Sequence, residues 1–312
     1  MKSILRNILK NILNVLMSNK FTIPIANYIF ETGSFKLKDF FILNVSQPKF
    51  NFRWNFSLLN GKQIKCNVIN GQQNTWHFAT SYKWHDLGLS IIEQHLNQFY
   101  DTSLTYMDIG SNVGLRSVYS LSIDRNTILI DPNPEVNKIT KSMIELNGFK
   151  HYTLEQIGLS DSDTGGELKF YISSSAYMSS FNKEHAALDK IVGEITIPVT
   201  SIDNYISKNS NVKPGILKID VEGFEMNVLK GAKNTLEKYK PAIIIEILDM
   251  GENRNEIVEY LAQFSYHPYF LFDKEFKMLR PLVKGEQITN HNYLFIANQE
   301  LEKYLSSRNC IE

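Results

Sequence analysis

The run YMDIGSNVG, residues 106–114, places a carboxylate at the end of an apolar stretch and directly before a turn with few side chains. Gly110 and Gly114 would let a ligand approach the backbone closely, and a helix starting after the turn would offer free N–H groups. Asp108 would repel a phosphate but attract an ammonium or a sulfonium. The turn therefore indicates a ligand with a positively charged end, unless Asp108 serves only as a helix N-cap.

Two common phosphate-binding turns do not fit these residues. A nicotinamide or flavin fold would need G-x-G-x-x-G, but the second and third glycine positions hold Asn112 and Leu115. A P-loop would end in Gly-Lys-Ser or Gly-Lys-Thr, and this turn does not. A dinucleotide or a nucleoside triphosphate is therefore not the expected ligand.

A second carboxylate stands about twenty residues after the turn, in the run ILIDPNP. Asp131 ends an apolar stretch there and is placed to accept hydrogen bonds from both ribose hydroxyls of an adenosine. S-adenosylmethionine combines a ribose with a cationic amino-acid end. The two acidic residues together therefore predict this cofactor, although Asp131 alone would also suit an N-cap.

Further ionisable residues lie where two later strands are expected to end. Lys218, Asp220 and Glu222 belong to GILKIDVEG, and Glu246 interrupts the apolar PAIIIEIL. If these strands are neighbours, the carboxylates converge, where they would share a proton, pair with the lysine or bind a divalent ion. Removing the proton of a hydroxyl needs a base or a metal. We expect Asp220 to act as the base, or Asp220 and Glu246 to hold any metal, whose identity the sequence leaves unknown.

A structural role for these residues is the alternative. Lys218 would then neutralise Asp220 and Glu246, while Glu222 and Glu225 would cap the next helix. A further candidate base, His185, lies in the insertion between the third and fourth expected strands, and a solvated loop histidine is the alternative interpretation.

These residues need a parallel sheet to bring them together. Five apolar segments read as strands and alternate with helical patterns, which is typical of a parallel sheet covered on both faces. The segments are residues 105–110, 127–131, 151–159, 215–220 and 241–248, with helices expected at 115–122, 135–148 and 224–239. A β-arm over about 163–203 is predicted as an insertion that walls the site, and two C-terminal strands and a short helix follow.

The first part of the chain is organised differently. Apolar residues at helical spacing with interspersed Lys and Arg predict an amphipathic helical segment within residues 1–35, which would lie on an anionic membrane or pack against protein. Residues 36–83 are expected to be β-rich, with strands over 36–80 and a hairpin at Asn60-Gly61. A helix with Leu89, Ile92 and Leu96 on one face is expected next.

Composition narrows the classes of protein. Lys and Arg total 33, as do Asp and Glu, and the pI is near 7.1, so no basic surplus favours nucleic acid. Cys66 and Cys310 form no CxxC pair, which suits a reducing cytoplasm. No apolar run approaches the ~20 residues of a membrane-spanning helix, and the interrupted N-terminus does not read as a signal peptide. We expect a cytoplasmic protein, peripheral at the inner membrane face if residues 1–20 bind lipid.

The motifs DIGSNVG, DPNP, ELNG, IGLSD, LKIDVEGFEMNVLKGA and PAIIIEI occur in an order and at a spacing that resemble the FkbM-type S-adenosylmethionine-dependent methyltransferases. The resemblance covers roughly residues 84–295 and makes 84–312 a methyltransferase domain. It implies a class I, Rossmann-like fold with a mostly parallel seven-stranded sheet whose last strand is antiparallel. It also implies O-methylation of a sugar hydroxyl in a glycan, glycolipid or natural product.

The same resemblance assigns cofactor residues by position. The family usually has glutamate where Asp131 stands and often alanine where Ser111 stands. The implied contacts to the amino-acid end of the cofactor are Asp108, Gly110, Ser111, Asn112 and Gly114. The implied contacts to the ribose are Asp131, Pro132 and Asn133, and those to the adenine are Gln156, Ile157 and Gly158.

Two other functions remain open at this point. A nicotinamide-dependent sugar-modifying enzyme would share the fold, although the glycine fingerprint is missing. A non-catalytic cofactor-binding subunit would also share it, although the acidic residues are intact. The expected partner in the main reading is a carbohydrate or another hydroxyl-bearing small molecule, and a homo-oligomer is left open.

Overall fold

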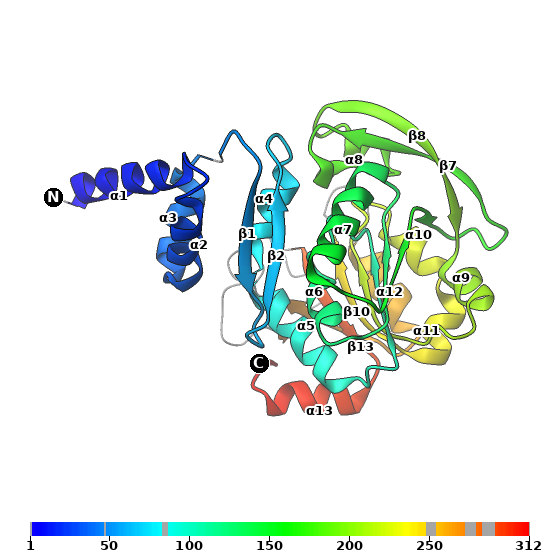
Figure 1. Cartoon of the computed structure of the whole chain (residues 1–312). Coiled ribbons are helices and arrows are strands. Elements are labelled where there is room, and N and C mark those ends of the chain that lie inside the picture. Colours follow the sequence, from blue (N-terminus) through cyan, green and yellow to red (C-terminus); the bar gives the residue numbers. More distant parts are fainter. Residues whose placement is uncertain are drawn as a thin grey trace. The chain divides into compact units, whose positions relative to one another are not determined.

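The computed structural model describes residues 2–46, 48–82, 87–247, 254–271, 279–282 and 291–311. The chain divides into two compact units, one made of residues 1–87 and 142–148 and the other of residues 88–141 and 149–312. Figure 1 labels the elements of both. The domain boundary expected between residues 83 and 84 lies outside the described residues.

In the described residues 2–46 and 48–82, the first unit contains three helices, a β-hairpin and a fourth helix, and the end of a later helix (residues 142–147) also belongs to it. Its elements are α1 (Lys2–Met17), α2 (Ile23–Thr32), α3 (Phe35–Asn44), β1 (Phe52–Ser57), β2 (Gln63–Val68) and α4 (Gln73–Ser81). The hairpin prediction is confirmed, because Phe52 pairs with Val68 and Ser57 with Gln63. Gly61 takes a φ of 86° in the turn, a conformation that glycine adopts without strain.

The expectation of strands throughout residues 36–80 is wrong at both ends, where α3 and α4 lie. Around α4 the buried residues Thr75, Phe78, Ala79 and Tyr82 recur at the 3.6-residue period of a helix. The prediction of strands failed here because aromatic residues have a high β-propensity, whereas in this unit helices also carry them into a shared core. The rings packed around the hairpin are those of Phe30, Phe41, Trp54 and Trp76.

An eight-stranded sheet forms the centre of the second unit, in the order β12-β11-β13-β10-β9-β3-β4-β5. The strands β5, β4, β3, β9 and β10 are parallel, whereas β13 runs antiparallel between β10 and β11. This is the class I methyltransferase fold, with one unexpected edge strand, β12. The strands are β3 (Thr105–Ile109), β4 (Thr127–Ile130), β5 (Tyr152–Glu155), β9 (Pro214–Ile219), β10 (Ala242–Glu246), β11 (His267–Leu271), β12 (Leu279–Pro281) and β13 (Asn292–Ile296).

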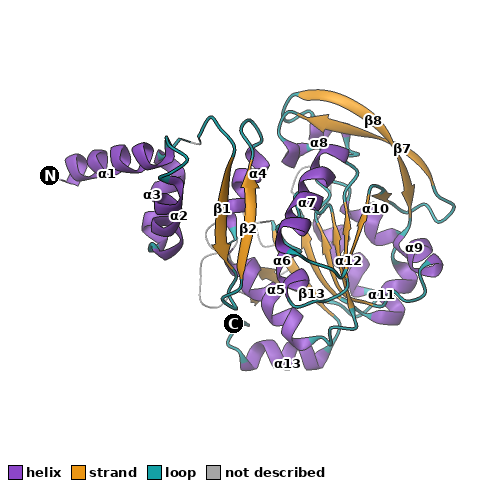
Figure 2. Ribbon diagram, in the orientation of Figure 1, coloured by secondary structure: helices purple, strands orange, loops and turns teal. Residues whose placement is uncertain are grey.

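Helices cover both faces of this sheet (Figure 2). Alternate strand residues point to opposite faces, so Met107 and Leu217 join one core while Tyr106 and Ile216 join the other. Helices α9 (Ile202–Lys208), α10 (Glu225–Lys230), α11 (Lys233–Tyr239) and α12 (Arg254–Ala262) contribute to the first core, and α5 (Leu87–Phe99) and α13 (Gln299–Ser307) to the second. Helices α6 (Val118–Ser122) and α7 (Pro134–Asn147) follow β3 and β4.

The predicted β-arm is present as a separate three-stranded sheet. Strands β7 (Gly166–Ser173) and β8 (Ile191–Thr200) pair antiparallel, with the short η1 (Ala176–Met178) and α8 (Lys183–Ala186) between them. The expected single strand over 151–159 is wrong, because the chain leaves the large sheet after β5. It continues as β6 (Gly158–Leu159), which pairs with β8 in the arm.

The single helix expected over residues 224–239 is also wrong, because it breaks into α10 and α11 at Gly231 and Ala232. A Cβ at Gly231 would lie 2.0 Å from the carbonyl oxygen of Ser160. The break therefore lets the backbone pass close to the segment that follows β6, a long-range contact that helical periodicity does not reveal.

Candidate active site

Four acidic residues lie at the carboxyl ends of neighbouring parallel strands. Asp108 stands near the end of β3, Asp131 follows β4, Asp220 follows β9, and Glu246 ends β10. The register of β3 and β9 sets Asp108 beside Lys218. Ligands of open parallel sheets bind beyond this edge. The structure thus brings together, at one edge of the sheet, the acidic residues that the sequence analysis named as candidates for cofactor binding and catalysis.

The turn after β3 is packed against the end of β9. Gly110 has a φ of 77°, and a Cβ there would lie 1.7 Å from the carbonyl oxygen of Asp220. Strand packing by itself therefore requires this glycine. Asn112 and Gly114 also take positive φ values, 46° and 78°. The buried hydroxyl oxygen of Ser111 has no hydrogen-bond partner within the described ranges, which leaves it to a polar ligand atom.

Asp108 is buried and only 1% exposed. Its Oδ2 accepts a hydrogen bond from the hydroxyl of Ser117 at 2.6 Å. Burial raises the pKa of the Asp108 carboxyl group to about 6, although the ammonium of Lys218 and the Ser117 hydrogen bond act in the opposite direction. A cationic ligand would favour the ionised form of this carboxyl group.

Asp131 is 7% exposed, and both of its oxygens accept backbone hydrogen bonds. Oδ2 accepts from the N–H of Asn112 at 2.9 Å and Oδ1 from the N–H of Asn133 at 2.8 Å. The Asp131 side chain is therefore held by the backbone around it. Burial raises its pKa to about 6, opposed by those two hydrogen bonds. Each carboxylate oxygen has a second lone pair, so ribose hydroxyls could still bind.

The neighbours of Asp131 have structural roles of their own. Pro132 is buried, as are Asp131 and Asn133 on either side of it in the chain. The side-chain oxygen of Asn133 accepts a hydrogen bond from the N–H of Glu135 at 3.1 Å, so Asn133 caps α7. The N-cap alternative that the sequence left open for Asp131 thus applies to Asn133.

Lys218 is the buried cation of the site. Its Nζ donates to Oδ2 of Asp220 at 2.8 Å, and its side chain is 1% exposed whereas that of Asp220 is 30% exposed. Burial would lower the pKa of the Lys218 ammonium, but the carboxyl groups of Asp220, Glu246 and Asp108 outweigh burial and raise it. The lysine therefore stays charged and holds Asp220 at the solvent-facing side of the group.

Glu246 and Asp220 act as a pair. Their side chains are hydrogen-bonded, and the negative charge of Asp220, followed by burial, raises the pKa of Glu246 well above its ordinary range. Two like charges this close disfavour ionisation of both carboxyl groups at once. Glu222 joins them, since one oxygen from each of the three carboxyl groups lies within 4.8 Å of the others. The predicted convergence of these residues is confirmed.

His185 faces this acidic group from α8 in the arm. The histidine is 4% exposed, and its Nε2 lies 2.8 Å from Oε2 of Glu222, at ion-pair distance but without aligned hydrogen-bond geometry. The arm is also fixed by Ser180, whose hydroxyl donates to the backbone oxygen of Glu222 at 2.7 Å. The reading of His185 as a solvated loop residue is therefore wrong. Burial raises the pKa of Glu222. The contact with His185 acts in the opposite direction but does not cancel the effect of burial.

The helix-capping role suggested for Glu222 and Glu225 is wrong, because α10 has no side-chain cap among the described residues and Glu225 instead accepts hydrogen bonds within the turn that precedes it. Its carboxylate accepts from the N–H groups of Val221 at 3.0 Å and Gly223 at 3.1 Å. The turn after β9 is thereby held from within, and Glu222 takes a φ of 56° in it. This leaves the Glu222 side chain directed to the arm instead of the helix.

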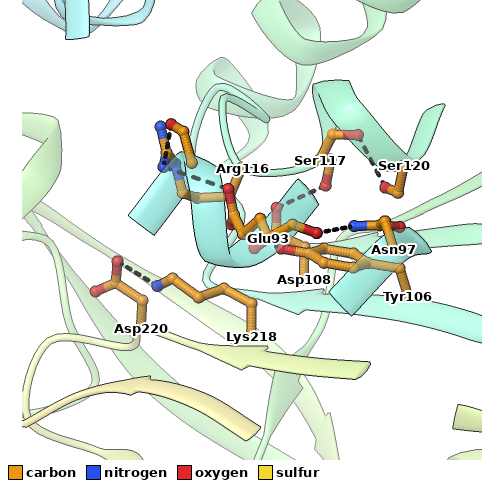
Figure 3. A network of polar contacts seen from close by, with 10 residues as sticks. Glu93, Asn97, Tyr106, Asp108, Arg116, Ser117, Ser120, Lys218 and Asp220 are labelled. Atoms are coloured by element: carbon orange, nitrogen blue, oxygen red, sulfur yellow. Dashed lines mark hydrogen bonds and ion pairs between the residues drawn. The ribbon is translucent and has the colours of Figure 1, made fainter. Parts of the chain in front are cut away.

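A buried network that the sequence reading missed supports the site from α5 (Figure 3). Glu93 is 1% exposed and accepts from the hydroxyl of Tyr106 at 3.0 Å and from Nη1 of Arg116 at 3.3 Å. Burial raises the pKa of Glu93 to about 7, opposed by Arg116. The available signal was a glutamate at helical spacing from Leu89 and Leu96, on the face of α5 that the structure buries.

The residues expected near an adenine lie where the chain crosses from the sheet to the arm. Gln156 is exposed, Ile157 is half-buried, and Gly158 is buried beneath the ring of Phe181. A Cβ at Gly158 would lie 2.4 Å from that ring, so glycine is required there. Gln156, Ile157 and Gly158 thus lie beside the edge of the sheet, and their position alone does not identify a ligand atom that they would contact.

These features fit a cofactor with a cationic end. Burial raises the pKa values of the Asp108 and Asp131 carboxyl groups, and a cationic ligand would favour their ionised forms. Ser111 offers an unused buried hydroxyl oxygen within the described ranges. The carboxyl groups of Asp220, Glu222 and Glu246 also suit a divalent cation by their oxygen chemistry and separation.

Comparison with known proteins gives one family match. A model described as the methyltransferase FkbM domain matches residues 108–278, more than half of the chain. The chain is 28% identical over 157 residues to a hexuronic acid methyltransferase, AglP, of Haloferax volcanii, covering 50% of this chain and 60% of that protein. It is 27% identical over 159 residues to methyltransferase 1 of Beauveria bassiana, covering 46% and 64%.

The matches therefore span less than two thirds of either relative's length. Among solved structures, the chain is similar to an FkbM methyltransferase from Methylobacillus flagellatus. That similarity has a TM-score of 0.42 and 15% sequence identity, and it covers 63% of this chain and 44% of the other.

Proposed function

The chain belongs to the FkbM methyltransferase family, and we propose that it transfers a methyl group from S-adenosylmethionine to a sugar hydroxyl. The cofactor follows from the family. The acceptor is a hydroxyl-bearing carbohydrate in this proposal, free or within a glycan, glycolipid or natural product. One relative is named a hexuronic acid methyltransferase, which makes a uronic acid the first acceptor to test.

The observation that carries the proposal is the arrangement of Lys218, Asp220 and Glu246 at the ends of β9 and β10. A hydroxyl must lose its proton as its oxygen is methylated, and a positioned carboxylate can take that proton. The side chain of Asp220 is 30% exposed, against 1% for Lys218, so an acceptor can reach Asp220. The base and its supporting cation stand at the edge where the family binds its cofactor.

In the proposed mechanism, the bound cofactor supplies a methyl group on a positively charged sulfur. Asp220 would take the proton of the acceptor hydroxyl, and S-adenosylmethionine, held by Asp108 and the turn after β3, would supply the methyl group to that oxygen and leave as the neutral thioether. Lys218 keeps Asp220 in place and stabilises its ionised form, and the hydrogen bond between Glu246 and Asp220 orients the Asp220 side chain. Positioning both reactants supplies much of the rate, up to ~7–11 kcal/mol in good cases.

Cofactor binding is assigned to the residues around the turn after β3. Asp108 and the backbone of the turn would hold the amino-acid end, with the Ser111 hydroxyl as a further contact. Asp131 would hold the ribose, and its existing hydrogen bonds would orient it for that contact. The complete set proposed is Asp108, Gly110, Ser111, Asn112, Gly114, Asp131, Pro132, Asn133, Gln156, Ile157 and Gly158.

Calorimetric titration with S-adenosylmethionine and with NADH tests the cofactor. We expect heat of binding with the first and none with the second, and the reverse would favour a nicotinamide-dependent enzyme. Methyl transfer from labelled cofactor to uronic acids and neutral hexoses then tests the acceptor. Cofactor binding without transfer to any saccharide would contradict the sugar assignment and favour a different acceptor or a binding subunit.

A further inference from the structure

Helix α1 leaves one apolar face uncovered. Its exposed apolar residues recur every three or four positions, which places them on one side of the helix, with Leu5 at its margin. The packing alternative accounts for the end of the helix only, where Leu13 and Met17 are buried. The face, called here the apolar face of α1, consists of Ile4, Leu5, Ile8, Ile12 and Val15, whose exposed fractions are 49–66%.

Exposed apolar side chains continue beyond the end of this helix. Phe21 is 78% exposed, and Ile25 and Tyr28 of α2 are 51% and 70% exposed. Scattered apolar residues on a protein surface are ordinary, but a run of this kind within thirty residues marks an interaction surface.

The charges around the apolar face of α1 indicate the kind of surface that it binds. Residues 1–20 contain four Lys or Arg and no Asp or Glu, although the whole chain has 33 of each sign. Lys10 and Arg6 are exposed on α1, and Arg6 lies over the ring of Phe40 with 5.4 Å between guanidinium carbon and ring centroid. Residues 1–30 contain no acid, so a second copy of this surface would oppose like charges. An anionic lipid surface supplies the opposite sign.

We propose that α1 docks on the surface of a bilayer that contains anionic phospholipid. The helix would lie in the plane of the interface, with Ile4, Ile8 and Ile12 in the boundary of the acyl chains and Lys10 among the headgroups. Within the described ranges no helix combines the length and the apolar character needed to cross a membrane. This surface contact goes beyond the methyl-transfer proposal and does not depend on it.

Vesicle sedimentation of the full chain tests the proposal, with vesicles of phosphatidylcholine alone and of phosphatidylcholine with phosphatidylglycerol. Ile8→Gln with Ile12→Gln removes apolar surface without changing charge and should weaken binding to the mixed vesicles about tenfold or more. The matched control, Asn7→Gln with Asn11→Gln, puts the same side chain at exposed polar positions of the same helix and should bind as the wild type does.

The charge component is tested separately. Lys10→Gln with Lys20→Gln should weaken binding to the mixed vesicles by about fivefold per lysine and have little effect with phosphatidylcholine alone. Circular dichroism and cofactor titration of every variant check that the fold and the cofactor site are unchanged.

Two outcomes would overturn the proposal. One is wild-type protein that does not sediment with the mixed vesicles, or an isoleucine pair that binds as well as the asparagine pair. The other is light scattering that shows a wild-type oligomer and a monomeric Ile8→Gln, Ile12→Gln variant without any vesicle binding. The apolar face of α1 would then be a contact between copies of the chain.

Discussion

Asp220 stands between a buried cation and a second carboxyl group, and its role can be separated from theirs by one substitution. Asp220→Asn keeps the shape of the side chain but removes its charge. Turnover should fall by the ~10²–10⁴-fold expected when a general base is lost. Folding should survive, because Glu246 can then ionise and balance Lys218. Single-turnover assays together with cofactor titration measure both effects.

The control for this substitution is Asp124→Asn, at an exposed site with a φ of 58° that asparagine adopts readily. It should leave turnover unchanged. Added Mg²⁺ or Mn²⁺ distinguishes two roles for Asp220, since stimulation of the wild type but not of Asp220→Asn would assign metal ligation with Glu222 and Glu246. Near-wild-type turnover with and without metal would return Asp220 to a structural role.

Asp131 is expected to contribute to both binding and stability. Asp131→Ala should weaken cofactor binding by roughly 1.5–3 kcal/mol, the range for hydrogen bonds to a charged group. It should also lower the free energy of unfolding by about 1–3 kcal/mol, because the N–H groups of Asn112 and Asn133 lose their acceptor. Calorimetric titration and urea unfolding separate the two losses.

The informative comparison is Asp131→Glu, the residue that the family usually has at this position. It should recover most of the cofactor affinity that alanine loses. Cofactor affinity in Asp131→Ala equal to that of the wild type would remove the ribose assignment, whatever happens to stability.

At the scale of elements, the break between α10 and α11 is maintained by one glycine. Gly231→Ala should destabilise the fold by about 1–3 kcal/mol, the usual cost of overpacking, because the new Cβ would meet the carbonyl oxygen of Ser160 at 2.0 Å. Gly193→Ala is the matched control, since a Cβ there meets nothing within 4 Å. Thermal unfolding compares them, and equal melting temperatures would mean that the backbone relaxes around Gly231.

Such contacts mark the limit of what the sequence could predict. Strands with continuous apolar residues, such as β3, β9 and β10, were predicted because burial on both faces requires that composition. The break at Gly231 was not, because it depends on a neighbour seventy residues away in the chain. Helices α3 and α4 were missed because their aromatic residues suit strands as well.

The acidic residues of the site could be predicted because they stand at the ends of strands. The residues that contact or support them, His185 and Glu93, could not. Convergence of Asp220 and Glu246 needed only that β9 and β10 be neighbours. Burial of His185 depends on how the arm folds back onto Glu222, and no local pattern encodes that contact. Glu93 was visible only as a charged residue at helical spacing from the apolar residues of α5.

For the molecule as a whole, the buried acidic groups predict how stability changes with pH. Glu93 has a pKa near 7, and Asp108 and Asp131 have values near 6, all raised chiefly by burial. The pKa values of Glu222 and Glu246 are raised as well. Each folded-state value exceeds the unfolded value near 4, so these groups take up protons on folding. Their contribution to stability is fully present below about pH 4 and is lost as the pH rises through 6 and 7.

One histidine opposes this trend. Burial, followed by Arg308, lowers the pKa of His95, so its contribution is lost at low pH and regained as the pH rises through its unfolded value near 6.5. Five carboxyl groups outweigh one histidine. We therefore expect the melting temperature of the cofactor-free protein to fall between pH 5 and pH 8, by about 5 °C or more at constant ionic strength.

Saturating S-adenosylmethionine should reduce or reverse this fall, because a cationic ligand favours the ionised forms of Asp108 and Asp131. Glu93→Gln should make the pH dependence shallower, whereas Glu145→Gln, at an exposed position of α7, should leave it unchanged. Scanning calorimetry over this pH range measures all four cases. A cofactor-free melting temperature that rises steadily from pH 5 to pH 8 would show that the sheet-edge carboxyl groups are ionised without a ligand, and would remove the electrostatic reason for a cationic one.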